Sequence, residues 1–187
     1  MSDSLSGEEL RRIFGSFATG VTIVTGVHPD GRPVGVTANS FSSVSLTPPL
    51  VLWCLAHSST SLQAFSVDAP FAVHVLRREQ TEIALHFSRS SPQKIVPTSD
   101  WLRNPEPPTI AGALARIDCR VVQLIDAGDH RIVLGRVERA ARAAGEPLLF
   151  YAGRFGEFVA APRDALPEQD AWSNVRDAAP SSSTLGT

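Results

Sequence analysis

The spacing of apolar residues predicts one helix near the start of the chain. Ser6 and Glu9 form a capping-box pattern, in which each side chain hydrogen-bonds the backbone N–H of the other residue. The apolar positions that follow are three or four residues apart: Leu10, Ile13, Phe14 and Phe17. This spacing places them on one face of a helix, which we expect to end at Gly20.

After Gly20 the pattern becomes extended, because apolar and β-branched residues alternate or run together in short stretches. We expect strands over residues 21–25, 32–38, 50–55, 71–76, 114–125, 130–139, 147–151 and 155–160. Turn sequences at 28–31 and 126–129 predict antiparallel hairpins. Other segments are expected to be short helices (within 57–66 and over 80–88), a polar loop (39–47) and a proline-rich surface excursion (89–112).

Strands outnumber helices in this pattern, and no regular alternation of strand and helix predicts parallel crossovers. We therefore expect a mainly β fold, a closed antiparallel barrel with peripheral helices, because closure removes exposed strand edges. The length of 187 residues fits one domain, which we place at residues 1–161. From residue 162 the composition shifts to Ala, Pro, Ser and Asp, so residues 162–187 are expected to be a tail, either disordered or docked on a partner subunit.

Charge and hydropathy exclude several classes of partner. The 17 basic and 19 acidic residues leave a net charge of −2, without the basic excess of a nucleic-acid-binding protein. The longest apolar run, residues 50–56, is too short to span a membrane, and the N-terminus shows no secretory signal pattern. We expect a cytoplasmic protein that binds neither nucleic acid nor membrane. Cys54 and Cys119 lie far apart in apolar runs and are expected to be buried thiols.

Standard catalytic and metal-binding signatures are absent from the sequence. It contains no GxGxxG, P-loop, CxxC, HExxH or GxSxG pattern, and its five histidines do not have metal-ligand spacing. We therefore expect no metal site and no acid–base or nucleophilic machinery.

Two segments rich in hydroxyl groups are candidate binding sites. Residues 35–45 lead from a strand into a loop of small polar side chains, which suits a flat polar ligand but also fits an ordinary serine-rich turn. Residues 58–61 place four hydroxyl residues at the start of an expected short helix. They would bind an anion there, or simply cap the helix.

Two further candidates lie near the predicted hairpins of the C-terminal half. His130 follows Gly128 and Asp129 at a hairpin start, where a loop-borne histidine either binds a ligand or remains solvated. In residues 150–155, aromatic side chains and Arg154 surround a glycine. These groups suit a stacked, phosphate-bearing nucleotide, and the alternative is a core hairpin with a surface arginine.

Together, the order and spacing of these segments resemble the flavin reductases of two-component flavin-dependent monooxygenases, a family with the FMN-binding split-barrel fold. The resembling segments are ATGVTIVT (18–25), GVTANSFSSVSLTPPLV (35–51), FAVHVL (71–76), GDH (128–130) and PLLFYAGRF (147–155). They cover roughly residues 10–160. His74 stands where the family often has Asn, and Ile95 where a Phe commonly follows the lysine.

The resemblance implies a homodimeric, Greek-key-like split β-barrel. It implies that the protein uses NADH or NADPH to reduce free FAD or FMN, and that the reduced flavin passes to a separate monooxygenase. Hydride transfer between two ring systems needs proximity and orientation, so no residue is expected to be catalytic in its own right. The alternatives are a split-barrel oxidase that retains its flavin and a non-catalytic flavin-binding carrier or sensor.

The resemblance also implies two sets of binding residues. Flavin would be bound by Thr37, Ala38, Asn39, Ser40, Cys54, Leu55 and Ala56, with its phosphate at Ser59, Thr60 and Lys94. The nicotinamide nucleotide would be faced by His130, Tyr151, Gly153, Arg154 and Phe155. His130 is the nearest candidate for a role in the reaction, and we expect it to position the nucleotide without donating a proton.

Overall fold

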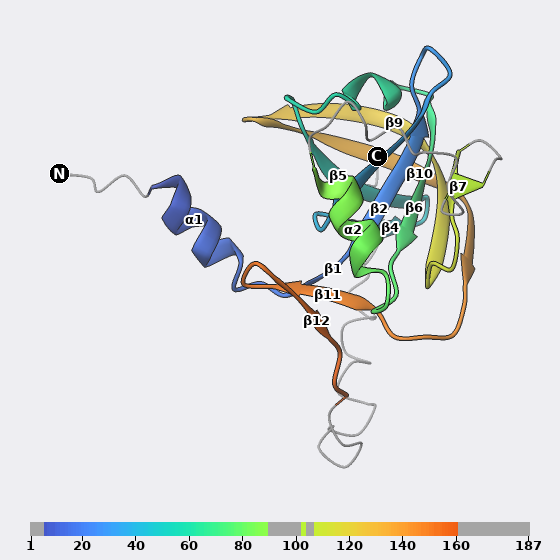
Figure 1. Ribbon diagram of the computed structural model, residues 1–187. Helices are drawn as coiled ribbons and strands as arrows, with labels where there is room; N and C mark the ends of the chain where they lie inside the picture. Colours follow the sequence, from blue (N-terminus) through green and yellow to red (C-terminus); the bar gives the residue numbers. More distant parts are fainter. Residues whose placement is uncertain (1–5, 90–101, 104–106, 161–187) are drawn as a thin grey trace, which may run out of the picture.

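The computed structural model describes residues 6–89, 102–103 and 107–160, and strands dominate this part of the chain (Figure 1). The N-terminal half contains α1 (Gly7–Phe14), β1 (Thr19–Gly20), β2 (Thr22–Val27), β3 (Pro33–Ala38), β4 (Ser42–Leu46), β5 (Pro49–Ala56), the 3₁₀ helix η1 (Leu62–Ala64), β6 (Pro70–Val75) and α2 (Thr81–Ser88). The C-terminal half contains β7 (Leu102–Arg103), β8 (Thr109–Ile110), β9 (Ala115–Ala127), β10 (His130–Arg142), β11 (Leu148–Tyr151) and β12 (Arg154–Glu157). The prediction of a mainly β chain with peripheral helices is confirmed.

The main sheet has seven strands in the order β3-β2-β6-β9-β10-β5-β4. Each of its strand pairs is antiparallel, as the hairpin turns predict. β3 and β4 are the two edges, and among the described residues no ladder of hydrogen bonds joins them. The closed barrel expected from the sequence is therefore met only in part: the sheet curves around a core, but its edges are not hydrogen-bonded to each other.

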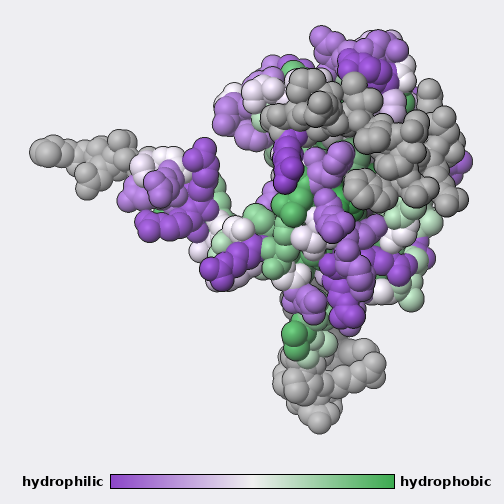
Figure 2. Space-filling model, in the orientation of Figure 1, coloured by the Kyte–Doolittle hydropathy of each residue, from purple (hydrophilic) through white to green (hydrophobic). Residues whose placement is uncertain are grey.

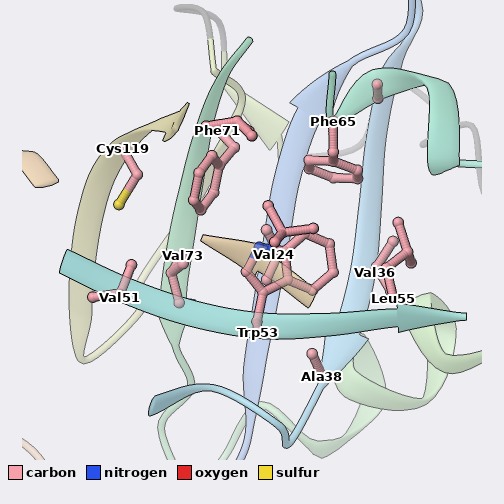
Figure 3. Packing of buried hydrophobic residues seen from close by; sticks show 13 residues of the cluster. Val24, Val36, Ala38, Val51, Trp53, Leu55, Phe65, Phe71, Val73 and Cys119 are labelled. Atoms are coloured by element: carbon pink, nitrogen blue, oxygen red, sulfur yellow. The ribbon is translucent and has the colours of Figure 1, made fainter. Parts of the chain in front are cut away.

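Side chains from both ends of the sheet meet in one core. Val36 and Ala38 of β3 belong to the same buried cluster as Trp53 and Leu55 of β5. In Figure 3 these side chains point toward one another between the strands. Trp53 packs edge-on against Phe65, with ring centroids 4.8 Å apart. Side-chain packing thus brings β3 close to β5, and this approach positions the site described below.

A second cluster lies under α2. Ile83 and Phe87 of α2 pack with Val21, Ile23 and Leu148, which links the helix to β2 and to the small sheet of β1, β11 and β12. No side chain intervenes where α2 crosses β3, because residue 35 is glycine. A Cβ added to Gly35 would lie 2.5 Å from the Phe87 ring. The last turn of α2 is thereby held close to the end of β3.

A second close approach leads to a stability prediction. Gly135 of β10 lies beneath Phe71, and a Cβ added there would lie 2.7 Å from Cε1 of that ring. Because interiors are close-packed, we expect Gly135→Ala to lower the free energy of unfolding by about 1–3 kcal/mol. Gly156→Ala in β12 is the matched control, since nothing lies within 4 Å of its Cβ position. Equal urea midpoints for the two variants would contradict this packing.

Two local expectations need correction, and a third is confirmed. Helix α1 ends at Phe14 with Gly15 as its cap, and Gly20 instead pairs with Leu149 in β1. The polar segment 39–47 contains β4, a serine-rich strand whose exposed position at the sheet edge tolerates polar residues. The predicted capping box of Ser6 and Glu9 is confirmed.

Other expectations concern the excursion, the thiols and the tail. Most of residues 89–112, and all of 162–187, lie outside the described residues.

Cys54 and Cys119 are free thiols, as predicted; Cys119 is buried and Cys54 half-buried. Burial raises the pKa of the Cys119 thiol to about 12. Neither helix in the described part of the chain is long and apolar enough to cross a membrane.

Candidate functional site

Two pockets adjoin where β3 meets the end of α2. The first, of about 260 Å³, is lined mainly by small polar residues and is called the hydroxyl pocket: Val36, Thr37, Ala38, Asn39, Ser40, Cys54, Leu55, Ala56, Ser58, Ser59, Ser88 and His130. The second, of about 300 Å³, is called the aromatic pocket: Val21, Thr37, Asn39, Leu85, Ser88, Phe150, Gly153 and Phe155. Thr37, Asn39 and Ser88 line both, so ligands in the two pockets would be neighbours.

Two hydroxyl groups that line the hydroxyl pocket hold its walls together. The Thr37 hydroxyl donates to the Ala84 carbonyl at 2.7 Å, which ties β3 to α2. The Ser40 hydroxyl accepts from the Cys54 N–H at 2.9 Å, which ties the β3–β4 loop to β5. Asn39 lies between them and is exposed. Its amide makes no hydrogen bond to another described residue, so it is available to a ligand.

The turn after β5 forms the far wall of the hydroxyl pocket. Ser59 donates its N–H to Ala56 and accepts the Ser61 N–H on its hydroxyl, which fixes a tight turn. Within the described part of the chain, the N–H groups of Ser58 and Thr60 have no acceptor. Hydroxyl groups and unpaired N–H groups on one turn suit an anion.

The predicted helix at this turn needs correction. Only three residues, Leu62–Ala64, are helical, as a 3₁₀ turn, and its N-cap Ser61 makes no side-chain capping bond. A helix dipole therefore contributes little here, because so short a turn aligns few peptide groups. Any anion would be held by the turn's hydroxyl and backbone groups.

His130 begins β10 and lies opposite Ala56 of β5. Its ring lines the hydroxyl pocket, and its Nδ1 lies 2.7 Å from an Asp129 carboxylate oxygen. Because an ionised carboxylate can only accept, Nδ1 carries the proton of this bond. The bond lowers the pKa of the Asp129 carboxyl below its usual value. Asp129 thus orients the imidazole and leaves Nε2 available.

The aromatic pocket is built by the β11–β12 hairpin against α2. Phe150 and Phe155 are cross-strand partners with ring centroids 5.5 Å apart. The turn between them reverses tightly, with φ of +78° at Gly153, a conformation that favours glycine. Leu85 and Ser88 of α2 complete the wall. An apolar slot with aromatic rings suits a flat ring ligand.

The structure brings most of the sequence-predicted residues together. The hydroxyl pocket contains Thr37, Ala38, Asn39, Ser40, Cys54, Leu55, Ala56, Ser59 and His130, and the aromatic pocket contains Gly153 and Phe155. Three predicted residues line neither pocket: Thr60, Tyr151 and Arg154. Lys94 lies outside the described residues. His130 lies with the predicted flavin residues, whereas Gly153 and Phe155 lie in the other pocket.

Sequence reasoning included Ser58 in the candidate anion segment 58–61 but missed the α2 residues Leu85 and Ser88. The last two are three positions apart, so helical spacing places them on one face. That spacing alone does not reveal that the face meets β3. The described residues contain no group of three or more His, Cys, Asp or Glu side chains placed to hold a metal ion. What the arrangement offers is two adjoining slots, one polar and one aromatic.

Comparison with known proteins gives a consistent result. Residues 14–158 match the family model described as flavin reductase like domain. The chain is 47% identical over 154 residues to "FMN reductase (NADH) SmoA" of Agrobacterium fabrum, covering 82% of this chain and 87% of that protein. It is 40% identical over 160 residues to "Flavin-dependent monooxygenase, reductase subunit HsaB" of Mycobacterium tuberculosis, covering 83% and 84%.

A solved structure shows the same fold with ligand fragments bound. It is the Streptomyces globisporus C-1027 NADH:FAD oxidoreductase SgcE6 in complex with NAD and FAD fragments. The match has a TM-score of 0.75 and 41% sequence identity, and it covers 88% of this chain and 100% of that chain.

Proposed function

The chain belongs to the flavin reductase-like family, and we propose that it transfers hydride from NADH to free FAD or FMN and releases the reduced flavin to a separate monooxygenase. The observation that carries this function is the pair of pockets joined at Thr37, Asn39 and Ser88. Two rings bound in these pockets would meet where the pockets adjoin, and hydride transfer requires such direct contact.

Flavin fits the hydroxyl pocket by the chemistry of its donors. The exposed Asn39 amide can bond a ring carbonyl or ring nitrogen, and Thr37 to Ser40 supply a polar edge for the ring and ribityl chain. The N–H groups of Ser58 and Thr60 and the Ser59 hydroxyl are placed for the phosphate. Such contacts are neutral and few, which suits a flavin that must leave after reduction.

NADH fits the aromatic pocket and the rim of the hydroxyl pocket. Phe150 and Phe155 offer faces for stacking, and His130 offers Nε2 at the rim. Bound flavin supplies the hydride acceptor, so the chain's residues need only orient the rings and exclude water. Tyr151 and Arg154, beside the β11–β12 turn, would contact the remainder of the nucleotide outside the two pockets.

Flavin dependence of NADH oxidation tests this function. The purified protein should be colourless after gel filtration and should oxidise NADH only when flavin is added. A protein that stays yellow and turns over without added flavin is instead an oxidase that retains its cofactor. A protein that binds flavin but consumes no NADH is a carrier or sensor.

Asn39→Ala tests the placement of flavin. Removing one neutral hydrogen bond costs about 0.5–1.5 kcal/mol, so we expect a roughly 3- to 10-fold weaker flavin affinity. Ser42→Ala is the control, because its hydroxyl is exposed and bonds only the neighbouring Ser43 carbonyl among the described groups. Flavin titration by fluorescence quenching measures both. Unchanged affinity in Asn39→Ala would refute the placement.

His130→Ala tests the placement of NADH. Loss of a positioning contact should raise the KM for NADH about 3- to 10-fold, while flavin affinity changes little. His130→Asn should recover part of the loss. A general acid would instead produce a limb in the pH–rate profile that vanishes in the variant. An unchanged KM for NADH, or an equal loss of flavin affinity, would contradict the positioning role.

Assembly and location complete the proposal. The functional form is a homodimer in the cytoplasm. Within each protomer, the barrel closes between β3 and β5 by side-chain packing in the shared core: Val36, Ala38, Trp53 and Leu55. Two features support the homodimer: the family resemblance, and large apolar residues that a single chain leaves exposed, including Phe14 and Phe17.

A further inference from the structure

Helix α2 is seated on β3 by two contacts of different kinds. The Phe87 ring lies over Gly35, where an added Cβ would approach it to 2.5 Å. The Thr37 hydroxyl donates to the Ala84 carbonyl at 2.7 Å. Gly35 and Thr37 are two positions apart on β3, so both contacts lie on one face of that strand. α2 lies at the front of the molecule in Figure 1, and Figure 2 shows hydrophilic and hydrophobic residues mixed over that side.

The two contacts restrict the helix in different ways. The packing of Phe87 and Ile83 is apolar and non-directional, so by itself it lets the helix pivot. A hydrogen bond weakens steeply when its angle is distorted, so the bond from Thr37 to Ala84 fixes the direction of the helix. α2 has eight residues, and its N-cap Gln80 makes no side-chain capping bond. A helix this short depends on its tertiary contacts for its placement.

The residues that α2 contributes to the site lie beside these two contacts. Leu85 follows Ala84, and Ser88 follows Phe87. Leu85 lines the aromatic pocket, and Ser88 lines both pockets. Leu85 is 43% exposed, so little packing within the described part of the chain holds it. A pivot of α2 about Phe87 therefore moves Leu85 and Ser88 relative to the β11–β12 hairpin, which forms the opposite side of the aromatic pocket.

We propose that Thr37 is a positioning residue for hydride transfer, and that it acts through Ala84 of α2. The bond between them sets the distance and angle between a nicotinamide ring in the aromatic pocket and a flavin ring in the hydroxyl pocket. The family resemblance assigns Thr37 to flavin binding, but a hydroxyl group has a single proton to donate, and Thr37 donates it to Ala84. The inference rests on the proposed function and specifies how the two rings are aligned.

Two substitutions at Thr37 separate the effect of its hydroxyl from that of its shape. Thr37→Val keeps the branched side chain and removes the donor, whereas Thr37→Ser keeps the donor. Because a displacement of about 1 Å can cost on the order of 100-fold in rate, we expect Thr37→Val to lower the rate of flavin reduction at saturating NADH by about 10- to 100-fold. Flavin affinity should change little, and Thr37→Ser should retain most of the wild-type rate. Anaerobic single-turnover reduction of FMN measures the rate, and flavin titration measures the affinity.

Thr25→Val is the matched control. The Thr25 hydroxyl donates to the Pro108 carbonyl at 2.6 Å, a bond of the same kind that joins a strand to a segment packed on it. Neither residue lines either pocket. Thr25→Val should lower the urea midpoint but leave the rate of flavin reduction unchanged. NADH stacked on FMN gives a long-wavelength charge-transfer absorbance before reduction, and this absorbance should be lost in Thr37→Val and kept in Thr25→Val.

Three results would overturn the positioning role. The first is an unchanged rate at saturating NADH in Thr37→Val. The second is a loss of flavin affinity in Thr37→Val as large as the loss of rate, which would show that the hydroxyl acts on the flavin itself. The third is an equal loss of rate in Thr37→Ser, which would show that the donor is not the cause. Each of these leaves flavin reduction by the wild-type protein, and with it the proposed function, in place. A wild-type protein that does not reduce flavin would overturn both.

Discussion

The free energy of unfolding should fall by about 3 kcal/mol as the pH is lowered from 6.5 to 4, because His74 is buried without a second hydrogen-bond partner. Its Nδ1 lies 3.2 Å from the Ile23 carbonyl and must donate to it, which leaves Nε2 to take up any further proton. Nε2 is buried and has no partner among the described residues. Burial, with Arg116 adding repulsion, lowers the pKa of His74 from 6.5 to about 4, against the opposing effects of the Ile23 carbonyl and Asp118.

The direction of the effect follows from proton uptake. Between pH 6.5 and 4 the unfolded chain binds a proton at this histidine and the folded chain does not, so stability falls with pH throughout that window. Above 6.5 both states are neutral, and below 4 both are protonated. The shift of roughly 2.5 pKa units corresponds to about 3 kcal/mol.

Urea titrations at several pH values measure this effect. His74→Asn, the amide common at this position in the family, can still donate to Ile23 and should flatten the dependence between pH 6.5 and 4. His57→Asn is the matched control, because the His57 side chain is 36% exposed and its ion-pair partner, the Asp126 carboxylate at 3.7 Å, is exposed as well. A His74→Asn variant that keeps the full wild-type slope would show that His74 does not govern this window.

The second large effect concerns the flavin phosphate. We expect kcat/KM for riboflavin to be about 10- to 100-fold below that for FMN, because hydrogen bonds to a charged group contribute about 1.5–3 kcal/mol. The donors are the N–H groups of Ser58 and Thr60 and the Ser59 hydroxyl on the turn after β5. The turn is followed by only three residues of 3₁₀ helix, so a helix dipole contributes little. The hydrogen bonds themselves must therefore supply the preference for FMN over riboflavin.

Steady-state kinetics with both flavins test this assignment. Ser59→Ala should reduce the preference for FMN severalfold, since it removes one donor to the phosphate and also the acceptor of the Ser61 N–H. Ser43→Ala, on the exposed strand β4, should leave the preference unchanged. Similar kcat/KM values for riboflavin and FMN in the wild-type protein would refute the phosphate site.

Local sequence signals predicted those parts of the fold that depend on nearby residues. The capping box placed the start of α1, and the turn glycines Gly31 and Gly128, with φ of +85° and +63°, placed two hairpins. The sequence did not predict elements that form only by pairing with another strand. β4 is polar and forms only because β5 offers it an edge, and Gly20 is extended because β11 pairs with it.

The same distinction applies to the residues of the candidate site: some could be predicted from the sequence and others could not. Thr37, Asn39 and Ser40 could be recognised as polar residues beside an apolar strand, and His130 as a histidine after a turn glycine, whereas Cys54 to Ala56 were assigned only through the family resemblance. Leu85 and Ser88 could not be recognised, because their role depends on α2 crossing β3, and that crossing depends on Gly35 lying beneath Phe87. The resemblance implied two sets of binding residues, but not that Thr37, Asn39 and Ser88 line both pockets, because that depends on the contact of α2 with β3.

Direct hydride transfer between rings bound in the two adjoining pockets is tested most directly by single-turnover reduction of flavin. Protein and FMN are mixed anaerobically with NADH, and the loss of flavin absorbance is followed. We predict a rate that saturates with NADH concentration, is slower with NADH deuterated at C4, and reaches half-saturation at higher NADH in His130→Ala. Flavin that stays oxidised, or a reduction rate indifferent to both NADH concentration and deuteration, would contradict hydride transfer between neighbouring pockets.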